Sequence, residues 1–584
     1  MQYEGDIEFS FKHTENPPRQ LFLLSWRGYR AERSHFNAGS TRVRFAFFAA
    51  ITAAAFISIG LALSGLVWAW IAFAVATPLA LLGIRDLLQS RHSLLRNYPV
   101  IAHMRWLFEG IRPEIRQYLI ESDADAYPFN REQRSLVYQR AKQEQETVPF
   151  GTQLDVYKAG YGYFTHSLAP VHLEQHNFRR RVGGPDCVQP YDISLLNISG
   201  MSFGAISANA IEALNRGAAT GGFAHDTGEG SISSYHRRHG GDLIWQIASG
   251  YFGCRTDDGM FDPEKFSATA ADPQVKMVEL KLSQGAKPGH GGVLPASKIT
   301  PEISETRGIP MGRDCVSPSA HPAFSTPNEL VAFLAELRRL SGGKPVGFKL
   351  CVGHLHEFMA ICKAMIAAGT YPDFIVVDGK EGGTGAAPVE FTDHLGMPLR
   401  EGLHFVHMTL VGAGIREHIR IGASGKIISG ADIATALSLG ADWCNAARGF
   451  MFAVGCIQAR SCHTNRCPTG VATQDPTRQR GLVVEDKYKR VANFHRNTLR
   501  GFAEMLGAMG LDDPSQIRPE TLHIRATDPD SILHHRLKPG QLFEEDCPSA
   551  FAAPWNLARV DTFRPADAMD LRNSGAHAAT EKQP

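Results

Sequence analysis

The sequence predicts an α/β protein in which a (β/α)8 barrel follows a pair of transmembrane helices. Between residues 190 and 450, short β-branched runs alternate eight times with helical stretches, the pattern of a barrel of parallel strands. From Phe45 to Ile84 no residue is charged. That run is about twice the ~20 residues that cross a bilayer once. A doubly wound open sheet is the alternative fold for the large domain.

The eight strands and their helices can be placed along the chain. Strands are expected at Ile193–Ser199, Gly222–Asp226, Leu243–Ser249, Met277–Leu282, Val346–Cys351, Phe374–Asp378, Lys426–Ser429 and Trp443–Ala446. Helices are expected at Ala205–Ala218, Pro327–Leu340, His354–Ala368, Leu403–Ile419 and Ala431–Leu439. A Gly- and Pro-rich insertion at 285–325 falls where barrels carry their active-site loops.

The predicted hairpin divides at Ser64-Gly65 and is flanked by arginines. By the positive-inside rule both of its ends, and the barrel with them, face the cytoplasm. We therefore expect the protein in the inner (cytoplasmic) membrane, held there through residues 45–84. The alternative is a buried core hairpin in a soluble protein. The flanking arginines are Arg42 and Arg44 before the hairpin, and Arg85, Arg91 and Arg96 after it.

The remaining segments complete the expected organisation. Helices between 86 and 150 carry apolar residues at helical spacing (Leu107, Ile111, Ile115 and Leu119), interpreted as packing faces. A net charge of +1 gives no sign of nucleic-acid binding. The expected domains are a polar cytoplasmic N-terminus (1–42), two transmembrane helices (43–85), a helical linker (86–168), the barrel (169–525, with a cysteine segment at 455–474) and a partly disordered C-terminal extension (526–584).

Three cysteines lie close together after the last predicted strand. Cys456, Cys462 and Cys467 have the spacing C-x5-C-x4-C, whereas the other seven cysteines are scattered. Thiolates this close suit a soft metal or an iron–sulfur cluster. Three ligands suggest a cluster that lacks one iron or takes one non-cysteine ligand. The alternative is three buried or free cysteines, and a disulfide framework is disfavoured.

Polar and glycine-rich loops follow several predicted strands. Lys281, Gln284 and Lys287 come at the end of the fourth strand, where they would converge on an anion or an electron-rich cofactor carbonyl. The alternative is that these lysines are merely solvated.

A second group of loops has the composition of a phosphate site. Gly382 and Gly383 belong to a glycine-rich loop that begins at Asp378, and its alternative is a flexible connection. Gly430 and Ala431 follow the seventh predicted strand, and Arg448 and Gly449 follow the eighth. Barrels often bind phosphate groups in these last two loops, beside a helix N-terminus.

Taken in order, five motifs resemble the FMN-binding synthase domain of glutamate synthases over residues 169–525. They are Met201-Ser202-Phe203-Gly204, Gly228-Glu229-Gly230, Lys281 with the run 284–289, the run 382–386 and the cysteine segment. The resemblance implies an FMN-dependent (β/α)8 barrel with a [3Fe–4S] cluster.

The resemblance also implies roles for particular residues. Cys456, Cys462 and Cys467 would be the cluster ligands. FMN would be bound by Met201, Ser202, Lys281, Asp378, Gly382, Gly383, Gly430, Ala431, Arg448 and Gly449. Gln284, Lys287 and Arg307 would lie near the carboxylates of 2-oxoglutarate, with Glu229 beside the substrate.

The function implied is reductive amination of 2-oxoglutarate, or a similar 2-oxo acid, with ammonia to L-glutamate. Electrons would come from ferredoxin or a partner reductase, because no dinucleotide-binding fingerprint is present. Ammonia would be free or supplied by a separate glutaminase, since the family's N-terminal catalytic cysteine is replaced by Met1-Gln2.

Two departures from the family pattern leave the substrate open. Val293 replaces a glutamine that helps to bind 2-oxoglutarate, and His290 replaces a glutamate. The alternatives are a related flavoenzyme that uses another amine, such as methylamine, and a membrane-tethered electron-transfer flavoprotein.

Overall fold

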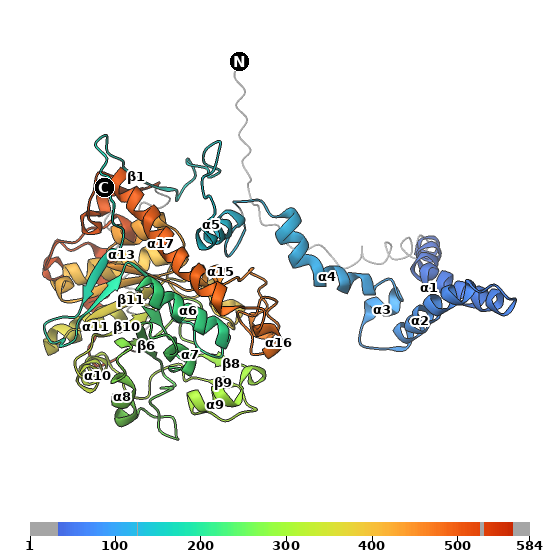
Figure 1. Ribbon diagram of the computed structural model, residues 1–584, viewed down its shortest axis with the longest axis horizontal. Helices are drawn as coiled ribbons and strands as arrows, with labels where there is room; N and C mark the ends of the chain where they lie inside the picture. Colours follow the sequence, from blue (N-terminus) through green and yellow to red (C-terminus); the bar gives the residue numbers. More distant parts are fainter. Residues whose placement is uncertain (1–32, 125, 526–530, 564–584) are drawn as a thin grey trace, which may run out of the picture. The chain divides into compact units, whose positions relative to one another are not determined.

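The computed structural model describes residues 33–124, 126–525 and 531–563 (Figure 1). The chain divides into two compact units, one up to Glu121 and one from Ser122 onward. The boundary lies inside the segment expected as a linker. The C-terminal extension was expected to be partly disordered, and its residues 564–584 lie outside the described residues.

The first unit is built on a helical hairpin. Helix α1 (Arg33–Leu63) and helix α2 (Ala69–Leu88) are joined by a short turn, in which Gly65 has a φ of +102° that favours glycine. A Cβ at Gly83 would collide with the Phe48 ring, so the two helices pack closely there. Arg44–Leu63 and Ala69–Leu88 are long and apolar enough to cross a membrane, by length and composition.

Two short helices and a π-helical turn follow the hairpin. They are α3 (Ser93–Asn97), α4 (His103–Ile115) and η1 (Arg116–Ile120). The carboxylate of Asp86, buried near the end of α2, accepts hydrogen bonds from Val100 N at 2.9 Å and from His103 Nε2 at 2.9 Å. The start of α4 is therefore tied directly to the end of the hairpin.

The second unit contains a closed barrel of eight parallel strands (Figure 1). Closure confirms the predicted barrel and excludes the open-sheet alternative. In spatial order the strands are β10 (Val346–Leu350), β11 (Phe374–Asp378), β12 (Arg420–Ser424), β13 (Trp443–Ala446), β4 (Leu196–Ile198), β5 (His225–Asp226), β6 (Leu243–Ile247) and β7 (Val275–Lys281), which pairs again with β10.

The seventh predicted strand is wrong in position. The strand is Arg420–Ser424, which pairs with β11 and β13, whereas Lys426–Ser429 forms the loop after it. Lys426 has a φ of +53°, which no extended strand allows. The strand contains a single β-branched residue, Ile421, whereas the loop carries Ile427-Ile428. The predicted helix Leu403–Ile419 ran past the actual helix end at Gly412 and stopped directly before the real strand.

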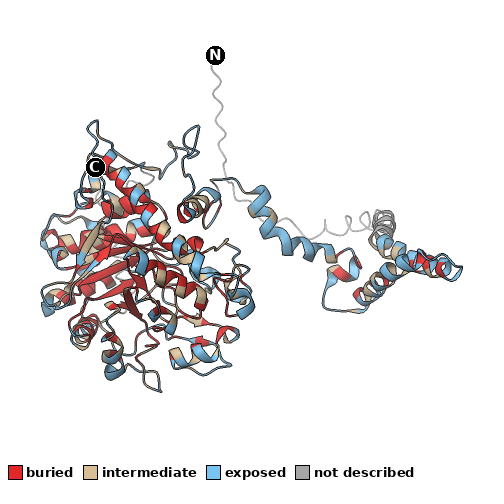
Figure 2. Ribbon diagram, viewed as in Figure 1, coloured by how far each residue is buried: buried red, intermediate tan, exposed pale blue. Residues whose placement is uncertain are grey.

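Helices surround the barrel and bury its outer surface (Figure 2). They are α6 (Ala208–Gly221), α7 (Ser234–Arg237), α8 (Pro263–Ala270), α10 (Pro327–Leu340), α11 (Leu355–Ala368), α12 (Val389–His394), α13 (Leu399–Gly412), α14 (Gly430–Ser438), α15 (Arg448–Ala453), α16 (Pro476–Gln479) and α17 (Val484–Ala508). Two more helices pack on this unit: α5 (Arg131–Lys142), and α18 (Ser549–Leu557), which lies in the extension that was expected to be partly disordered.

Shorter elements frame the barrel. They are the strand pairs β1 (Gly162–Phe164) with β14 (Leu522–Ile524), β2 (Arg179–Val182) with β3 (Tyr191–Ser194), and β8 (Val293–Leu294) with β9 (Cys315–Val316), and the helix α9 (Pro301–Arg307). The last pair and α9 are formed by the Gly- and Pro-rich insertion.

The barrel interior holds charged side chains rather than only apolar ones. Gln246 Nε2 donates to Asp226 Oδ2 at 3.2 Å and to Glu279 Oε1 at 2.6 Å. Burial raises the pKa of both carboxyls, although the nearby Lys349 ammonium opposes it. Lys349 is itself buried, and the carboxylates of Asp378, Glu279 and Asp226 hold its pKa above the usual value against the effect of burial. This polar layer lies beneath the strand ends that carry the predicted site.

Candidate functional site

One carboxylate and three cations meet at the carboxyl ends of the strands. Lys281 Nζ, at the end of β7, lies 3.1 Å from Glu229 Oε2, which follows β5. Burial by itself would raise the pKa of Glu229, but the positive charges of Lys281, Arg307 and Lys287 outweigh it and hold the pKa below its usual value. Glu229 is therefore an anion at neutral pH.

Lys287 is more deeply buried than Lys281, the other lysine predicted for this site. Its exposed fraction is 2 %, and burial lowers its pKa despite the nearby Glu229 carboxylate. Gln284 precedes it on the same turn, where Lys287 N donates to the Gln284 carbonyl at 3.3 Å. A lysine so placed gives up its proton more readily than one in water.

Arg307 reaches the site from the last residue of α9. Thr300 caps that helix and Gly308 ends it in a left-handed conformation, which sets where Arg307 projects. Arg307 Nη2 donates to Ser202 Oγ at 3.2 Å and to Phe203 O at 2.7 Å. Among the described residues its buried Nε has no hydrogen-bond partner, so the guanidinium keeps donor capacity for a ligand.

The glycine-rich loops close around this charge cluster. A Cβ at Gly292 would collide with the Glu229 carboxylate, and one at Gly285 would collide with the carbonyl of Gly379. Asp378 Oδ2 accepts from Gly285 N at 2.7 Å, which joins the loop after β7 to the loop after β11. A Cβ at Gly382 would lie 3.4 Å from Asp378 Oδ2. These glycines allow backbone approach that other residues would prevent.

Arg448 begins α15 and extends over the glycine-rich loop. Its Nη2 donates to the Glu381 carbonyl, and a Cβ at Gly383 would lie 3.0 Å from Arg448 Nε. Burial lowers the pKa of Arg448 to about 10, opposed by the charges of Asp378 and Glu381. The structure thus joins Gly383 and Arg448, which the sequence places on separate loops.

The first turn of α14 is prepared as an anion-binding element. Ser429 Oγ accepts from Asp432 N at 3.2 Å, while Asp432 Oδ2 accepts from Ser429 N at 2.9 Å. This capping box satisfies one N–H of the first turn, and the N–H groups of Gly430 and Ala431 have no acceptor within the helix. A Cβ at Gly430 would collide with the backbone of Phe502 on α17, and one at Gly449 would lie 3.2 Å from Ile427 O.

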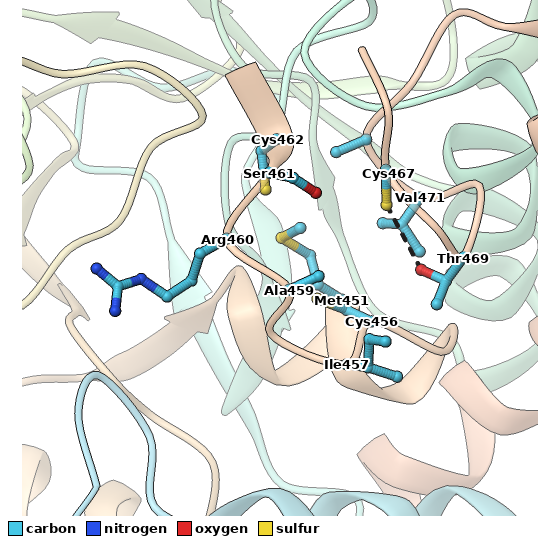
Figure 3. Close-up of a pocket in the computed structure, with 11 residues that line it drawn as sticks. Met451, Cys456, Ile457, Ala459, Arg460, Ser461, Cys462, Cys467, Thr469 and Val471 are labelled. Carbon is cyan, nitrogen blue, oxygen red and sulfur yellow. Dashed lines mark hydrogen bonds between the residues drawn. The ribbon is translucent and has the colours of Figure 1, made fainter. Parts of the chain in front are cut away.

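The three clustered cysteines line one small pocket (Figure 3). It also has apolar walls from Met451, Ile457 and Val471. All ten cysteines are free thiols. Within the described residues, no three Cys, His, Asp or Glu side chains converge on one point as ligands of a single metal ion. An iron–sulfur cluster makes a different demand, because its cysteines are shared among several irons instead of meeting at one.

The surroundings of the thiols differ from one cysteine to the next. Burial raises the pKa of Cys456 to about 12 and also raises that of Cys462. Cys467 is buried too, but hydrogen bonds from the Ala472, Thr469 and Val471 donors hold its pKa below the usual value. Figure 3 shows the Thr469 hydroxyl against the Cys467 sulfur, at 3.5 Å. Such donors stabilise sulfur-centred negative charge.

Two contacts of this pocket were missed from the sequence. Lys298, on the insertion before α9, is 3 % exposed, and the Cys462 and Cys467 sulfurs partly oppose the burial that lowers its pKa to about 8. Its Nζ donates to Ala205 O at 2.7 Å. A single lysine in a long insertion carries no pattern that would have revealed it.

The second missed contact is the segment just before the barrel. Tyr138 on α5 donates from its hydroxyl to Cys456 O at 2.7 Å. Phe129 and Gln458 form a pair of hydrogen bonds, at 3.2 Å and 3.0 Å. Part of the expected linker therefore supports the cysteine segment.

An eight-stranded parallel barrel whose mouth combines buried cations with a three-cysteine pocket belongs to the class of (β/α)8-barrel enzymes, whose chemistry is set by the loops at that mouth. Residues 174–512 match the family model described as a conserved region in glutamate synthase. The chain belongs to the glutamate synthase family and is an oxidoreductase of that type.

Some similar proteins match most of this chain, and others match only about half of it. A glutamate synthase large subunit-like protein of Bacillus subtilis is 36% identical over 79% of this chain and 96% of its own length. The archaeal-type glutamate synthase [NADPH] of Thermotoga neapolitana is 38% identical over 54% of this chain, and 60% of its length is matched. The archaeal glutamate synthase [NADPH] of Archaeoglobus fulgidus is 37% identical over 56% of this chain and 61% of its own length.

Proposed function

We propose that the protein reductively aminates 2-oxoglutarate, or a closely similar 2-oxo acid, to the L-amino acid, with FMN and a [3Fe–4S] cluster as its cofactors. The balanced reaction consumes the oxo acid, ammonia, two electrons and two protons, and releases L-glutamate and water. Electrons would come from ferredoxin or a partner reductase. The observation that carries the proposal is the meeting of Lys281, Lys287 and Arg307 around Glu229.

FMN fits the residues at the mouth of the barrel. The loop glycines leave room for a flat ring system, and the free N–H groups at the start of α14 suit a phosphate. Met201, Ser202, Lys281, Asp378, Gly382 and Gly383 would border the ring, with Gly430, Ala431, Arg448 and Gly449 toward the phosphate. When bound, FMN supplies hydride transfer, and the protein supplies binding and orientation.

The cluster fits the thiol pocket. Cys456, Cys462 and Cys467 would each ligate one iron, and the donors around Cys467 would stabilise its thiolate. A cluster there would supply single electrons close to the flavin site. Lys298 would place a positive charge beside two of the ligands.

The chain's own residues would handle the substrate. Lys287 and Arg307 would bind carboxylate oxygens, with Gln284 as a further polar contact. Lys287 Nζ is suited to donate a proton to the carbonyl oxygen as it leaves as water, since burial weakens its hold on that proton. The Glu229 carboxylate would orient the attacking ammonia by accepting hydrogen bonds from it. Fixing both reactants in line lowers the barrier by about 7 kcal/mol or more in favourable cases.

The hairpin would place this chemistry at a membrane. We propose that α1 and α2 span the inner membrane with both ends in the cytoplasm, as the flanking arginines indicate. Ammonia would enter from solution or from a separate glutaminase. No observation on the described residues favours the electron-transfer role without an oxo acid.

A second amine substrate has one observation in its favour. Val293 begins β8 directly after Gly292, which lies against the Glu229 carboxylate. Val293 stands where the family has a glutamine that helps to bind 2-oxoglutarate, so that polar contact is absent here and the usual substrate is less strongly favoured. Methylamine is therefore the alternative amine.

The test is anaerobic turnover of the purified protein with reduced ferredoxin, 2-oxoglutarate and either ammonia or methylamine. The proposal predicts L-glutamate from ammonia. N-methylglutamate as the faster product would favour the methylamine alternative. Flavin reoxidation without any amino acid product would contradict both.

A further inference from the structure

Helix α4 carries an apolar face that the described part of its unit leaves uncovered. Met104, Leu107, Phe108, Ile111 and Ile115 recur at spacings of one, three and four residues, which places them on one side of the helix. No residue of α4 is buried (Figure 2), and Leu107 and Phe108 are 60 % and 54 % exposed. The sequence led us to expect a packing face here, and in the structure that face is open.

Helix α5, which has nearly the same length and belongs to the other unit, buries apolar residues that α4 would leave exposed. There Val137 and Ala141 are 0 % and 2 % exposed and lie in the core. Contiguous exposed apolar surface of the α4 kind marks an interaction site in proteins. The question is what covers it.

Position and charge both indicate a lipid surface. Asp86 ties the start of α4 to the end of α2, so the helix begins where the apolar hairpin ends. From residue 85 to 120 there are six arginines and three acidic residues. Arg105, Arg112 and Arg116 follow one another at spacings of seven and four, along the border of the apolar face. Arginines beside an apolar face are typical of helices that lie in a membrane interface.

We propose that α4 lies in the cytoplasmic interface of the membrane that the hairpin enters, with its apolar face among acyl chains and its arginines on anionic headgroups. This inference rests on the proposed insertion of the hairpin. Trp106 contacts the His92 and His103 rings at centroid distances of 5.9 and 6.0 Å, so the side of α4 that carries it faces α3. The apolar face is on another side of the helix.

The test uses the full chain reconstituted in nanodiscs that contain phosphatidylglycerol and phosphatidylcholine. The photoreactive residue p-benzoylphenylalanine is placed singly at Leu107, at Glu109 and at Ile71, and the adducts are identified by mass spectrometry. Glu109 is nearly opposite Leu107 on the helix and is the matched control. Ile71 is an exposed α2 residue that reports whether the hairpin itself is in lipid.

The proposal predicts lipid adducts at Ile71 and at Leu107, with the Leu107 yield at least about fivefold above that at Glu109. Replacing Arg105, Arg112 and Arg116 together by Gln should lower the Leu107 yield and remove its dependence on phosphatidylglycerol. Lipid adducts at Ile71 with protein adducts at Leu107, whether to the barrel or to a second copy, would overturn the inference alone. No lipid adduct at either position would overturn the membrane placement as well.

Discussion

The cationic half of the barrel mouth (Glu229, Lys281, Lys287 and Arg307) and its thiol half (Cys456, Cys462 and Cys467) are assembled differently from the chain. The thiol half comes from one continuous segment, Cys456–Cys467, and the Tyr138 hydroxyl donates a hydrogen bond to the Cys456 carbonyl. The cationic half is assembled from three separate parts of the chain: Glu229 after β5, Lys281 and Lys287 after β7, and Arg307 at the end of α9. Glu229 and Lys281 already form an ion pair, whereas the thiols stay apart.

That difference bears on what each half needs to become functional. The cationic half is preorganised, because its charges hold one another without a ligand. The thiol half has two thiols whose pKa burial raises, Cys456 and Cys462. These two cysteines lose their protons when metal replaces them. We therefore expect damage to the thiol half to remove a cofactor, and damage to the cationic half to weaken substrate handling.

The largest effect is expected from Cys462→Ala. The variant should lose its iron and sulfide, and turnover with a one-electron donor should fall to background, because a cluster ligand is gone. Flavin content should stay at the wild-type level. Iron, sulfide and flavin analysis checks this, with Cys547→Ala as the control thiol. Full iron retention in Cys462→Ala would refute the ligand assignment.

Lys287→Met removes one of the three cations of the cationic half. We expect kcat/KM for the oxo acid to fall about 100-fold, the cost of removing one partner from a buried charge group. Iron and flavin content should be unchanged. The control is Lys276→Met, near the start of β7, the strand that precedes the Lys287 loop, where kcat/KM should be unaltered. Equal losses in both variants would indicate general destabilisation instead.

Gly292→Ala should have an intermediate effect. Its added Cβ would displace the Glu229 carboxylate, and overpacking of this kind costs about 1–3 kcal/mol. Steady-state kinetics should show a loss of about tenfold in kcat/KM, with the cluster spectrum intact. Gly353→Ala is the control, because nothing lies within 4 Å of a Cβ there. A wild-type rate for Gly292→Ala would remove Glu229 from the substrate site.

The smallest effect at neutral pH is expected from His321. Its Nε2 donates to Lys281 O at 2.9 Å, and burial lowers its pKa to about 4. Since unfolded histidine titrates near 6.5, the folded state binds fewer protons between pH 6.5 and 4, and stability falls as pH falls through that window. The slope per histidine is about 1.4 kcal/mol per pH unit.

His321→Gln should therefore flatten the pH dependence of denaturant unfolding by about one proton. Measurements from pH 7.5 to 4.5 on the wild type and the variant test this. An unchanged slope would contradict this, because it would mean that the pKa of His321 is the same in the folded and unfolded states.

The continuity of each feature in the chain decided how well it could be predicted. The three cysteines and the Lys281–Lys287 turn each lie within a short run of the chain, so their spacing in the sequence alone predicted that each group would lie together. Arg307 and Glu229 were placed only through the family resemblance, because contacts between distant elements leave no local pattern. Lys298 was marked neither by a local spacing nor by the family resemblance. The barrel was predicted from its alternation, but β12 was misplaced because it contains only one β-branched residue, Ile421, whereas the loop after it contains the pair Ile427-Ile428. The strand pairing and the positive φ of Lys426 show which of the two is the strand.

The most direct test of the account is one anaerobic titration of the purified protein. Reduced ferredoxin is added with 2-oxoglutarate and ammonia, and flavin absorbance and L-glutamate are followed together. The account predicts a bound flavin that is reduced by ferredoxin and reoxidised by the two substrates, with one glutamate formed per two electrons. Protein with no flavin spectrum, or reoxidation without an amino acid product, would contradict it.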